Sequence, residues 1–545
     1  MELAGAKLSS SSQDVMPKVD DVTAVVQQAQ DPSTPGKGQT DAPLAKNAFN
    51  NLSAFGFSFA VLNTWVVLVV GLGSGLASGG PSALLWGFVY AFIGNLAITL
   101  SHSEMLAVFP TAGGQYHWAA MLSPPRYRAA ISWATGLMNV ISLWLGAASV
   151  GYLSATLLIS AILVNSPEWT PTAGEQYGIF AAVTLFGPLI SLVLGSKGNR
   201  LLDTTLMLLS VVAAVAIFIT LLATAQPKAS ASFVFAGTNN ATGWDSLAIA
   251  WLLGVLQSAF SFLGFDIVYH ISEEMPNPRR EGPKVVNMTI IVGGVSGVLI
   301  LLAMLFAVND IDSLLGTAYG LPFAQLCLDS TGSAAATTIF LVIPSLLFMN
   351  SSRGICLTAA RVLMSLGRDN VLPRSDLFQI VKLGEPIYGL CLSFMVALLC
   401  GLVQLGSTAA FSSLLGAATI MFQLTYGIPV ALMLLGGRKK LDQYMPARGF
   451  NLGPWGVVCN VVSCFFVVES CVIYCFPAAM PVSPSSMNYV IVFTGGFGFI
   501  LAVVWFSWAR SRFPGPSEEK IMALSNGSVV EMSGEEPGEH EQVVL

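Results

Sequence analysis

The feature that most constrains this chain is a succession of apolar stretches, each long enough to cross the roughly 30 Å of hydrocarbon in a bilayer. Charged residues make up only 10% of its 545 residues, whereas soluble domains carry roughly 25%. We therefore expect an all-α polytopic membrane protein with twelve transmembrane helices. The spans are predicted at about 52–76, 82–107, 129–155, 177–195, 201–225, 246–270, 287–309, 333–360, 386–405, 409–436, 455–476 and 487–509.

Lysine and arginine placement tests this count independently, because positive charge is retained on the cytoplasmic side of membranes. If the amino terminus is cytoplasmic, 22 of the 24 basic residues fall in tails or loops on the inner side. Lys228 falls outside and Arg353 lies within a span. The pattern predicts a multi-pass protein with both termini in the cytoplasm.

Three regions are expected along the chain. Residues 1–50 are polar and predict a disordered cytoplasmic tail, residues 51–510 hold the twelve helices, and residues 511–545 predict an acidic, disordered cytoplasmic tail. The two tails are segments on which trafficking or ubiquitination machinery can act.

The composition excludes several classes of function. So few charges rule out a cytosolic enzyme, a secreted disulfide scaffold and a nucleic-acid binder. The eight cysteines form no C-x-x-C pair and the four histidines are dispersed, so we expect no metal site and no cofactor. A membrane enzyme would need convergent catalytic groups, and ATP-driven pumping would need a G-x-x-x-x-G-K-[ST] loop, which the sequence lacks.

Polar groups inside a bilayer are costly, so each one needs an explanation. Span 1 carries Asn63 and Thr64 at its middle, and span 6 carries Ser261, Gly264 and Asp266 among phenylalanines. Small polar residues with glycine near midspan favour a break in the helix, whose freed peptide groups can bind a polar solute. Ordinary helix packing through small residues is the alternative.

Four segments resemble motifs of the fungal amino acid/choline permeases, which belong to the amino acid–polyamine–organocation superfamily. SFLGFDIVYHISEEMPNPRREGPKVV at 261–286 is similar to their sixth helix and the following loop. SEMLAVFPTAGGQYHWAAML at 103–122, SGGP at 78–81 and TAARVLMSLGRDNVLP at 358–373 are similar to family segments in the same order and spacing. The resemblance covers about residues 50–510.

The resemblance implies a fold and a site. The fold is a 5+5 inverted repeat with broken helices 1 and 6, with repeat one at about 52–225, repeat two at about 246–436 and two extra helices at about 455–509. Thr64, Ser261 and backbone groups would hold polar substrate atoms, and aromatic rings would face an ammonium group. The substrate-binding residues so implied are Asn63, Thr64, Trp65, Phe260, Ser261, Phe262, Gly264, Phe265 and Asp266.

The ionisable residues within the spans leave alternatives open. Asp266 either neutralises a cationic substrate, exchanges a proton, caps the second half of helix 6, or pairs with His270. Glu104 either has a structural role at the cytoplasmic gate or takes part in proton coupling. Arg353 pairs with Asp266 or Glu469, contacts a substrate carboxylate, or lies nearer the cytoplasm. Asp266, His270, Glu104 and Arg353 are the candidates for proton coupling or gating.

By this resemblance the protein is a secondary transporter of a small nitrogenous solute such as an amino acid, 4-aminobutyrate or choline. Protons are the implied co-substrate and the plasma membrane the implied location. A nutrient-sensing transceptor and an exporter of a nitrogen-containing secondary metabolite are the alternatives. Asn240, in the sequon Asn240-Ala-Thr of an outer loop, is a candidate glycosylation site.

Overall fold

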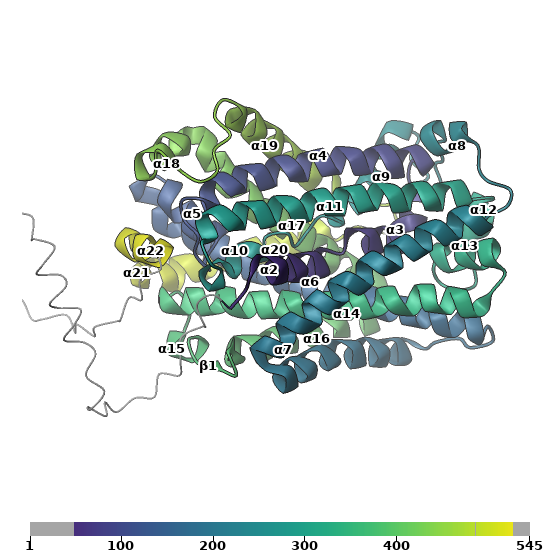
Figure 1. Cartoon of the computed structure of the whole chain (residues 1–545), viewed down its shortest axis with the longest axis horizontal. Helices are drawn as coiled ribbons and strands as arrows, with labels where there is room; N and C mark the ends of the chain where they lie inside the picture. The colour runs from purple at the N-terminus through teal and green to yellow at the C-terminus, as the bar shows by residue number, and fades with distance from the viewer. Residues whose placement is uncertain (1–47, 485–486, 527–545) are drawn as a thin grey trace, which may run out of the picture. The chain divides into compact units, whose positions relative to one another are not determined.

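Long apolar helices dominate the computed structural model, which describes residues 48–484 and 487–526 (Figure 1). Ten helical segments of this described part are long and apolar enough to cross a membrane. Their components are α2 (Asn51–Leu62) with α3 (Thr64–Ala77), α4 (Gly80–Leu106), α6 (Arg128–Asn165), α7 (Ala173–Thr224), α11 (Pro278–Ala307), α14 (Ala334–Arg368), α16 (Ile387–Gly406), α17 (Thr408–Leu432), α19 (Trp455–Ile473) and α20 (Val490–Val504).

Two interruptions break the helical pattern where the sequence predicts them. Asn63 separates α2 from α3 with φ 37° and ψ 47°, a left-handed conformation that asparagine tolerates better than most residues. α9 (Leu247–Phe260) ends before a run of turns at 261–266, and α10 (Ile267–His270) follows. Gly264 within this run has φ +94°, which only glycine adopts without strain.

The predicted spans at 177–195 and 201–225 lie within the single element α7 and meet without a loop. Gly195, with φ 61° and ψ −178°, breaks the helical geometry at their junction. Helix α6 also extends about ten residues beyond its predicted end, as far as Asn165. The main differences from the sequence prediction therefore lie in where these helices begin and end.

The core lies between helices that are distant in sequence. α14 packs along α6, α11 along α4, and α17 along α6. Large apolar side chains cover the outward faces: Val193 is 85% exposed, and Phe499 and Phe506 are each 71% exposed. Apolar side chains exposed on this scale are solvated by lipid rather than by water.

Short elements cap the two ends of the helices. Figure 1 shows α8, α12 and α13 gathered at one end, and α5, α15, α18 and α22 at the other. The bounds are η1 (Pro125–Tyr127), α5 (Gln115–Leu122), α8 (Ala231–Ala236), η2 (Ser272–Glu274), α12 (Ile311–Leu315), α13 (Pro322–Thr331), α15 (Ser375–Phe378), η3 (Met433–Gly437), α18 (Arg438–Tyr444), η4 (Trp505–Ala509), α21 (Arg510–Arg512) and α22 (Glu518–Ser525).

A two-stranded antiparallel hairpin lies beside α15. β1 (Val381–Lys382) pairs with β2 (Glu385–Pro386), with Val381 opposite Pro386. Leu383 and Gly384 both have positive φ, as a two-residue hairpin turn requires.

The prediction of disorder from residue 511 onward is wrong for residues 518–525, which form α22. Ser517 caps this helix and Glu518 and Glu519 occupy its first turn, where negative charge is favourable. Ile521 is 1% exposed, so the helix packs against the rest of the protein. The predicted amino-terminal tail up to residue 47, and residues 527–545, lie outside the described residues.

Candidate functional site

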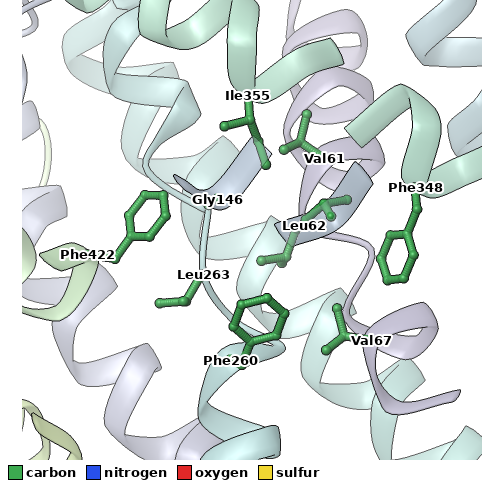
Figure 2. Close-up of a pocket in the computed structure, with 11 residues that line it drawn as sticks. Val61, Leu62, Val67, Gly146, Phe260, Leu263, Phe348, Ile355 and Phe422 are labelled. Atoms are coloured by element: carbon green, nitrogen blue, oxygen red, sulfur yellow. The ribbon is translucent and has the colours of Figure 1, made fainter. Parts of the chain in front are cut away.

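A cavity lies between the two interruptions, halfway along the helices. Its walls come from α2, α3, α6, α9, α14, α17 and the 261–266 segment, and Figure 2 shows their side chains converging on one space. The space open to a water-sized sphere is ≈ 20 Å³, room for about one water molecule. The lining residues are Val61, Leu62, Val67, Gly146, Val150, Phe260, Leu263, Gly264, Phe348, Ile355 and Phe422.

A second, larger cavity of ≈ 310 Å³ adjoins the first, and part of its lining comes from α3, which packs against α12 and α13. Gly71 and Ser74 of α3, Gln257 of α9 and Thr419 of α17 are among its lining residues. Phe260 lines both cavities. Phe260 therefore lies where the central cavity meets the second one, which we call the outer cavity.

Of the predicted binding residues, only Phe260 and Gly264 line the central cavity. Phe262 stacks on Phe88, with ring centroids 5.0 Å apart, and Phe265 packs on Tyr426 at 4.6 Å. The Ser261 hydroxyl donates to the carbonyl of Ser258 (2.7 Å). These side chains hold the 261–266 segment in place.

Asn63 joins three helices at the break of helix 1. Its amide nitrogen donates to the Ala60 carbonyl (2.6 Å) and reaches the Ser351 hydroxyl of α14 (3.3 Å). Its amide oxygen accepts from Ser210 of α7 (2.9 Å), and Ser210 accepts from the Trp65 indole (2.9 Å). Asn63 and Trp65 therefore fix the interruption, while the neighbouring Thr64 hydroxyl is buried without a hydrogen-bond partner in the described part of the chain.

Asp266 points away from the central cavity, into a buried polar cluster. Its Oδ2 accepts from Gln115 of α5 (2.8 Å) and lies 3.4 Å from the Asn139 amide of α6. Its Oδ1 accepts from the Tyr426 hydroxyl of α17 (2.9 Å). His270 Nε2 lies 3.6 Å from Oδ2. The carboxylate makes no capping bond to α10. Of the two structural roles expected for Asp266, capping helix 6 and pairing with His270, the geometry therefore shows the second.

A network of ion pairs joins the elements at the end of the helices that carries α5, α15 and α22; we call it the gate cluster. Glu273 pairs with Arg368 (2.7 Å), and Arg361 pairs with Glu274 (2.7 Å) and Glu385 (3.1 Å). The further pairs join Asp369 to His117 (2.9 Å) and to Lys520 (3.0 Å). Arg361 and Arg368 thus pair with the adjacent acids Glu274 and Glu273, whereas Arg279 bonds to Asn526 and Met445.

The gate cluster shifts the acidity of its carboxyl groups. Burial alone would raise the pKa of Asp369, but its hydrogen bond with His117 and the charge of Lys520 lower it to about 2. Burial and the nearby Glu274 carboxylate raise the pKa of Glu385, against the opposing effect of Arg361.

Glu104 lies at the end of α4 and is fully buried. It pairs with Arg438 at 2.7 and 3.0 Å and with Arg448 at 3.1 Å, and it accepts from the Leu452 amide (3.1 Å). These four contacts join α4 to the segment between α17 and α19, so Glu104 ties helices together.

Arg353 is buried and paired, but its partner is Asp203 of α7 and neither Asp266 nor Glu469. It also donates to Asn350 (2.9 Å) and lies 3.3 Å from the Ser191 hydroxyl. The expectation of structural pairing holds, and the two partners proposed from the sequence are wrong. Arg353 does not line the central cavity.

Two other residues singled out from the sequence, Glu469 and Asn240, have hydrogen-bond partners outside the central cavity. The Glu469 carboxylate accepts from Tyr90 (3.3 Å). Asn240 is exposed, and its amide nitrogen donates to the Trp244 carbonyl (2.7 Å).

The cavity walls supplied by α6, α14 and α17 are absent from the sequence prediction. Gly146, Phe348, Ile355 and Phe422 carry no polar group, and in sequence they cannot be told from core residues. Only the packing of α6, α14 and α17 around the interruptions identifies them.

Comparison with known proteins places the chain in a family. The amino acid permease family model matches residues 49–497. The chain is 28% identical to a putative amino acid/polyamine transporter of Macrophomina phaseolina, over 80% of this chain and 96% of that one. It is 29% identical to the choline transporter of Saccharomyces cerevisiae, over 86% and 82%.

A third relative is the swainsonine transporter of Arthroderma benhamiae, 30% identical over 88% of this chain and 95% of that one. Among solved structures, a nucleobase-cation-symport-1 family transporter in a closed conformation matches with a TM-score of 0.49 and 14% identity, covering 90% of this chain and 99% of that one. The family match spans most of the apolar helices and both interruptions. This chain therefore belongs to the amino acid permease family, within the amino acid–polyamine–organocation superfamily.

Proposed function

We propose that the protein is a proton-driven symporter of a small nitrogenous solute in the plasma membrane, with both termini cytoplasmic. The observation that carries this proposal is the cavity between the interruption at Asn63 and the interruption at 261–266. Irregular backbone is tolerated at membrane depth only where it lines a cavity, and there its peptide groups can bind a solute.

Helix ends supply the polarity that the cavity side chains lack. α3 begins at the break of helix 1, so its amino-terminal N–H groups and positive dipole end favour a carboxylate. α2 and α9 end beside the cavity, and their terminal carbonyls favour an ammonium group. A zwitterionic amino acid or 4-aminobutyrate presents both groups.

The size and the apolar walls of the cavity limit which substrates can bind. No charged side chain is among the lining residues, and three phenylalanine rings, Phe260, Phe348 and Phe422, surround the space (Figure 2). Such rings pack against hydrocarbon and also attract a cationic head group, by about 0.5–2 kcal/mol each. Choline therefore stays a candidate substrate beside amino acids, as do the other nitrogenous solutes for which the fungal relatives are named.

The two ends of the helices support alternating access. The ion pairs of the gate cluster join the helices at the end that carries α5 and α22, and we take the described conformation as closed toward that side. Basic residues predicted to be cytoplasmic, among them Arg361, Arg368 and Arg438, lie at this same end. Transport to the cytoplasm would require these pairs to separate.

Twelve spans are part of the proposal. The ten long segments count α7 once, although the break at Gly195 divides it into two stretches. α9, the 261–266 segment and α10 add the broken sixth span. An inverted repeat of five and five, with two extra helices, accounts for this arrangement.

The test is uptake of labelled amino acids, 4-aminobutyrate and choline by cells that lack their own permeases, at two external pH values. Accumulation of at least one solute, greater at the lower pH, is expected. Gly146→Val should abolish accumulation, because even a single Cβ added at Gly146 would lie 2.9 Å from the Phe422 ring. Gly495→Val on α20 is the matched control, since nothing lies within 4 Å of a Cβ there. Equal loss in both variants, or no accumulation by the unaltered protein, would contradict the proposal.

A further inference from the structure

The buried cluster around Asp266 contains a nitrogen that the hydrogen-bond network leaves one proton short. His270 Nδ1 lies 2.8 Å from the Ala112 carbonyl oxygen. A carbonyl only accepts, so Nδ1 carries a hydrogen. In a neutral imidazole Nε2 would then be a bare lone pair, and it faces the Asp266 Oδ2 at 3.6 Å.

Two acceptors cannot face each other in a dry site without cost. Asp266 is 0% and His270 1% exposed, and His270 Nε2 has no other partner in the described part of the chain. A proton placed between them turns the contact into an ion pair and cancels the buried negative charge. Donors from Gln115 and Tyr426 already point at the carboxylate, so the proton belongs on Nε2.

The other two described histidines show no such deficit. His102 Nε2 lies 2.9 Å from the Tyr426 carbonyl and its Nδ1 lies 3.2 Å from the Tyr269 hydroxyl, so the neutral ring has a partner at both nitrogens. His117 has the Thr111 hydroxyl at 2.7 Å on Nδ1 and Asp369 at 2.9 Å on Nε2, where its own N–H can donate. Only for His270 does the closed conformation require an added proton.

The remaining titratable groups around the pair are either neutral or already engaged. Tyr426 on α17, His102 on α4 and Tyr269 on α10 face it. α2 carries no titratable side chain, while α5, α11, α14 and η2 also pack nearby. Their charged or ionisable residues include Tyr116, His117, Arg279, Arg280, Glu281, Lys284, Arg353, Arg361, Arg368, Glu273 and Glu274, and in the described ion pairs none of these engages Asp266 or His270.

The pair is connected to both the cavity and the gate cluster. Toward the cavity, the Gly264 amide donates to the Tyr426 hydroxyl (3.2 Å), which donates to Asp266. Toward the gate, His270 holds Ala112 in the loop before α5 and Asp266 holds Gln115 at the start of α5. The Ala112 amide donates to Glu273 (2.8 Å). A change of charge at the pair therefore acts on the substrate segment and on the loop together.

We infer that Asp266 and His270 form the proton-binding site of the transport cycle, holding one proton on His270 Nε2 while the gate cluster is closed. When the gate opens, water reaches the pair, the proton leaves to the cytoplasm, and the carboxylate is hydrated instead of paired. This inference rests on the proposed proton-driven transport. Since one proton is bound, the ratio of closed to open forms changes by at most tenfold per pH unit.

The first test needs no substrate. The thermal stability of the purified full-length protein is measured from pH 5 to pH 9 for the unaltered protein, His270→Asn, Asp266→Asn and His102→Gln. Asn at 270 keeps a donor for the Ala112 carbonyl but cannot titrate. We expect the unaltered protein and His102→Gln to lose stability as pH rises, and the other two variants to lose that dependence. The same slope in His270→Asn as in the unaltered protein would overturn the inference.

The second test uses proteoliposomes and labelled choline, 4-aminobutyrate and leucine in turn. Asp266→Asn and His270→Asn should lose accumulation driven by a pH gradient, by at least tenfold, and keep exchange at equal concentrations. Gradient-driven accumulation in either variant overturns the proton site. If the unaltered protein accumulates none of the three, proton-driven transport of these solutes fails instead, and the stability measurement still decides the proton site.

Discussion

The ammonium group of Lys520 lies 3.0 Å from the Asp369 carboxylate, so the carboxyl-terminal segment pairs with the residue that ends α14. Glu518, two residues earlier, pairs with Arg128 at the start of α6 (3.1 Å). Helix α22 therefore lies across the ends of two helices at the gate cluster, and it must leave if these helices separate.

Lys520→Ala should weaken closure of the gate cluster. Lys520 is 20% exposed and Asp369 4% exposed, so we expect about 1 kcal/mol, or about a fivefold shift toward the open form. The rate at which a cytoplasmic maleimide labels a cysteine placed at Thr111 would report it. Lys520→Arg, which keeps the charge, should label at the original rate, and unchanged labelling of the alanine variant would count against a closing role for α22.

Acid should destabilise the gate cluster only well below neutral pH. Because the pKa of Asp369 is lowered to about 2 from 3.8, its contribution is complete above about pH 5 and is lost as pH falls through that lower value. Between pH 5 and pH 3 the loss is about 1 kcal/mol. Melting temperatures of the purified protein should fall over this range, and those of Asp369→Asn should fall less. An equal fall in both would refute the assignment.

The Arg353–Asp203 pair should be needed for folding and not for substrate choice. Arg353→Leu leaves the Asp203 carboxylate buried without its partner and should cost about 3–5 kcal/mol. Replacing both residues by leucine should restore most of that stability. Thermal melts and the uptake panel check this together. A changed substrate preference in the double variant would contradict the finding that Arg353 does not line the central cavity.

Phe260→Ala should open the central cavity to the outer one. The ring lines both spaces, and an apolar side chain of this size contributes about 1.5–3 kcal/mol when buried. We expect the half-saturating substrate concentration to rise about tenfold or more. Phe262→Ala removes a ring that stacks on Phe88, so it should lower stability with a smaller effect on affinity; the reverse order would be inconsistent with the geometry.

The sequence predicts the membrane class, most spans and both interruptions because each depends on a local signal. Hydropathy identifies spans, and Asn63 and Gly264 are residues that tolerate positive φ. The break at Gly195 has the same kind of signal, but the predicted spans are separated by a loop there.

The site is less predictable, because it depends on contacts between distant segments. Arg353 and Asp203 are 150 positions apart, and the cavity walls on α6, α14 and α17 are ordinary apolar residues. Helix α22 was detectable from the sequence: Ser517 followed by Glu518 and Glu519 is a helix-start pattern. The acidity of the whole segment obscured it.

The hydrocarbon walls of the central cavity have a consequence for how such proteins diversify. Exchanging one aliphatic or aromatic side chain for another can reshape the chamber while leaving every titrating group and every ion pair where it stands. New solutes can thus be accommodated by single apolar replacements, without rebuilding the polar contacts that join the helices.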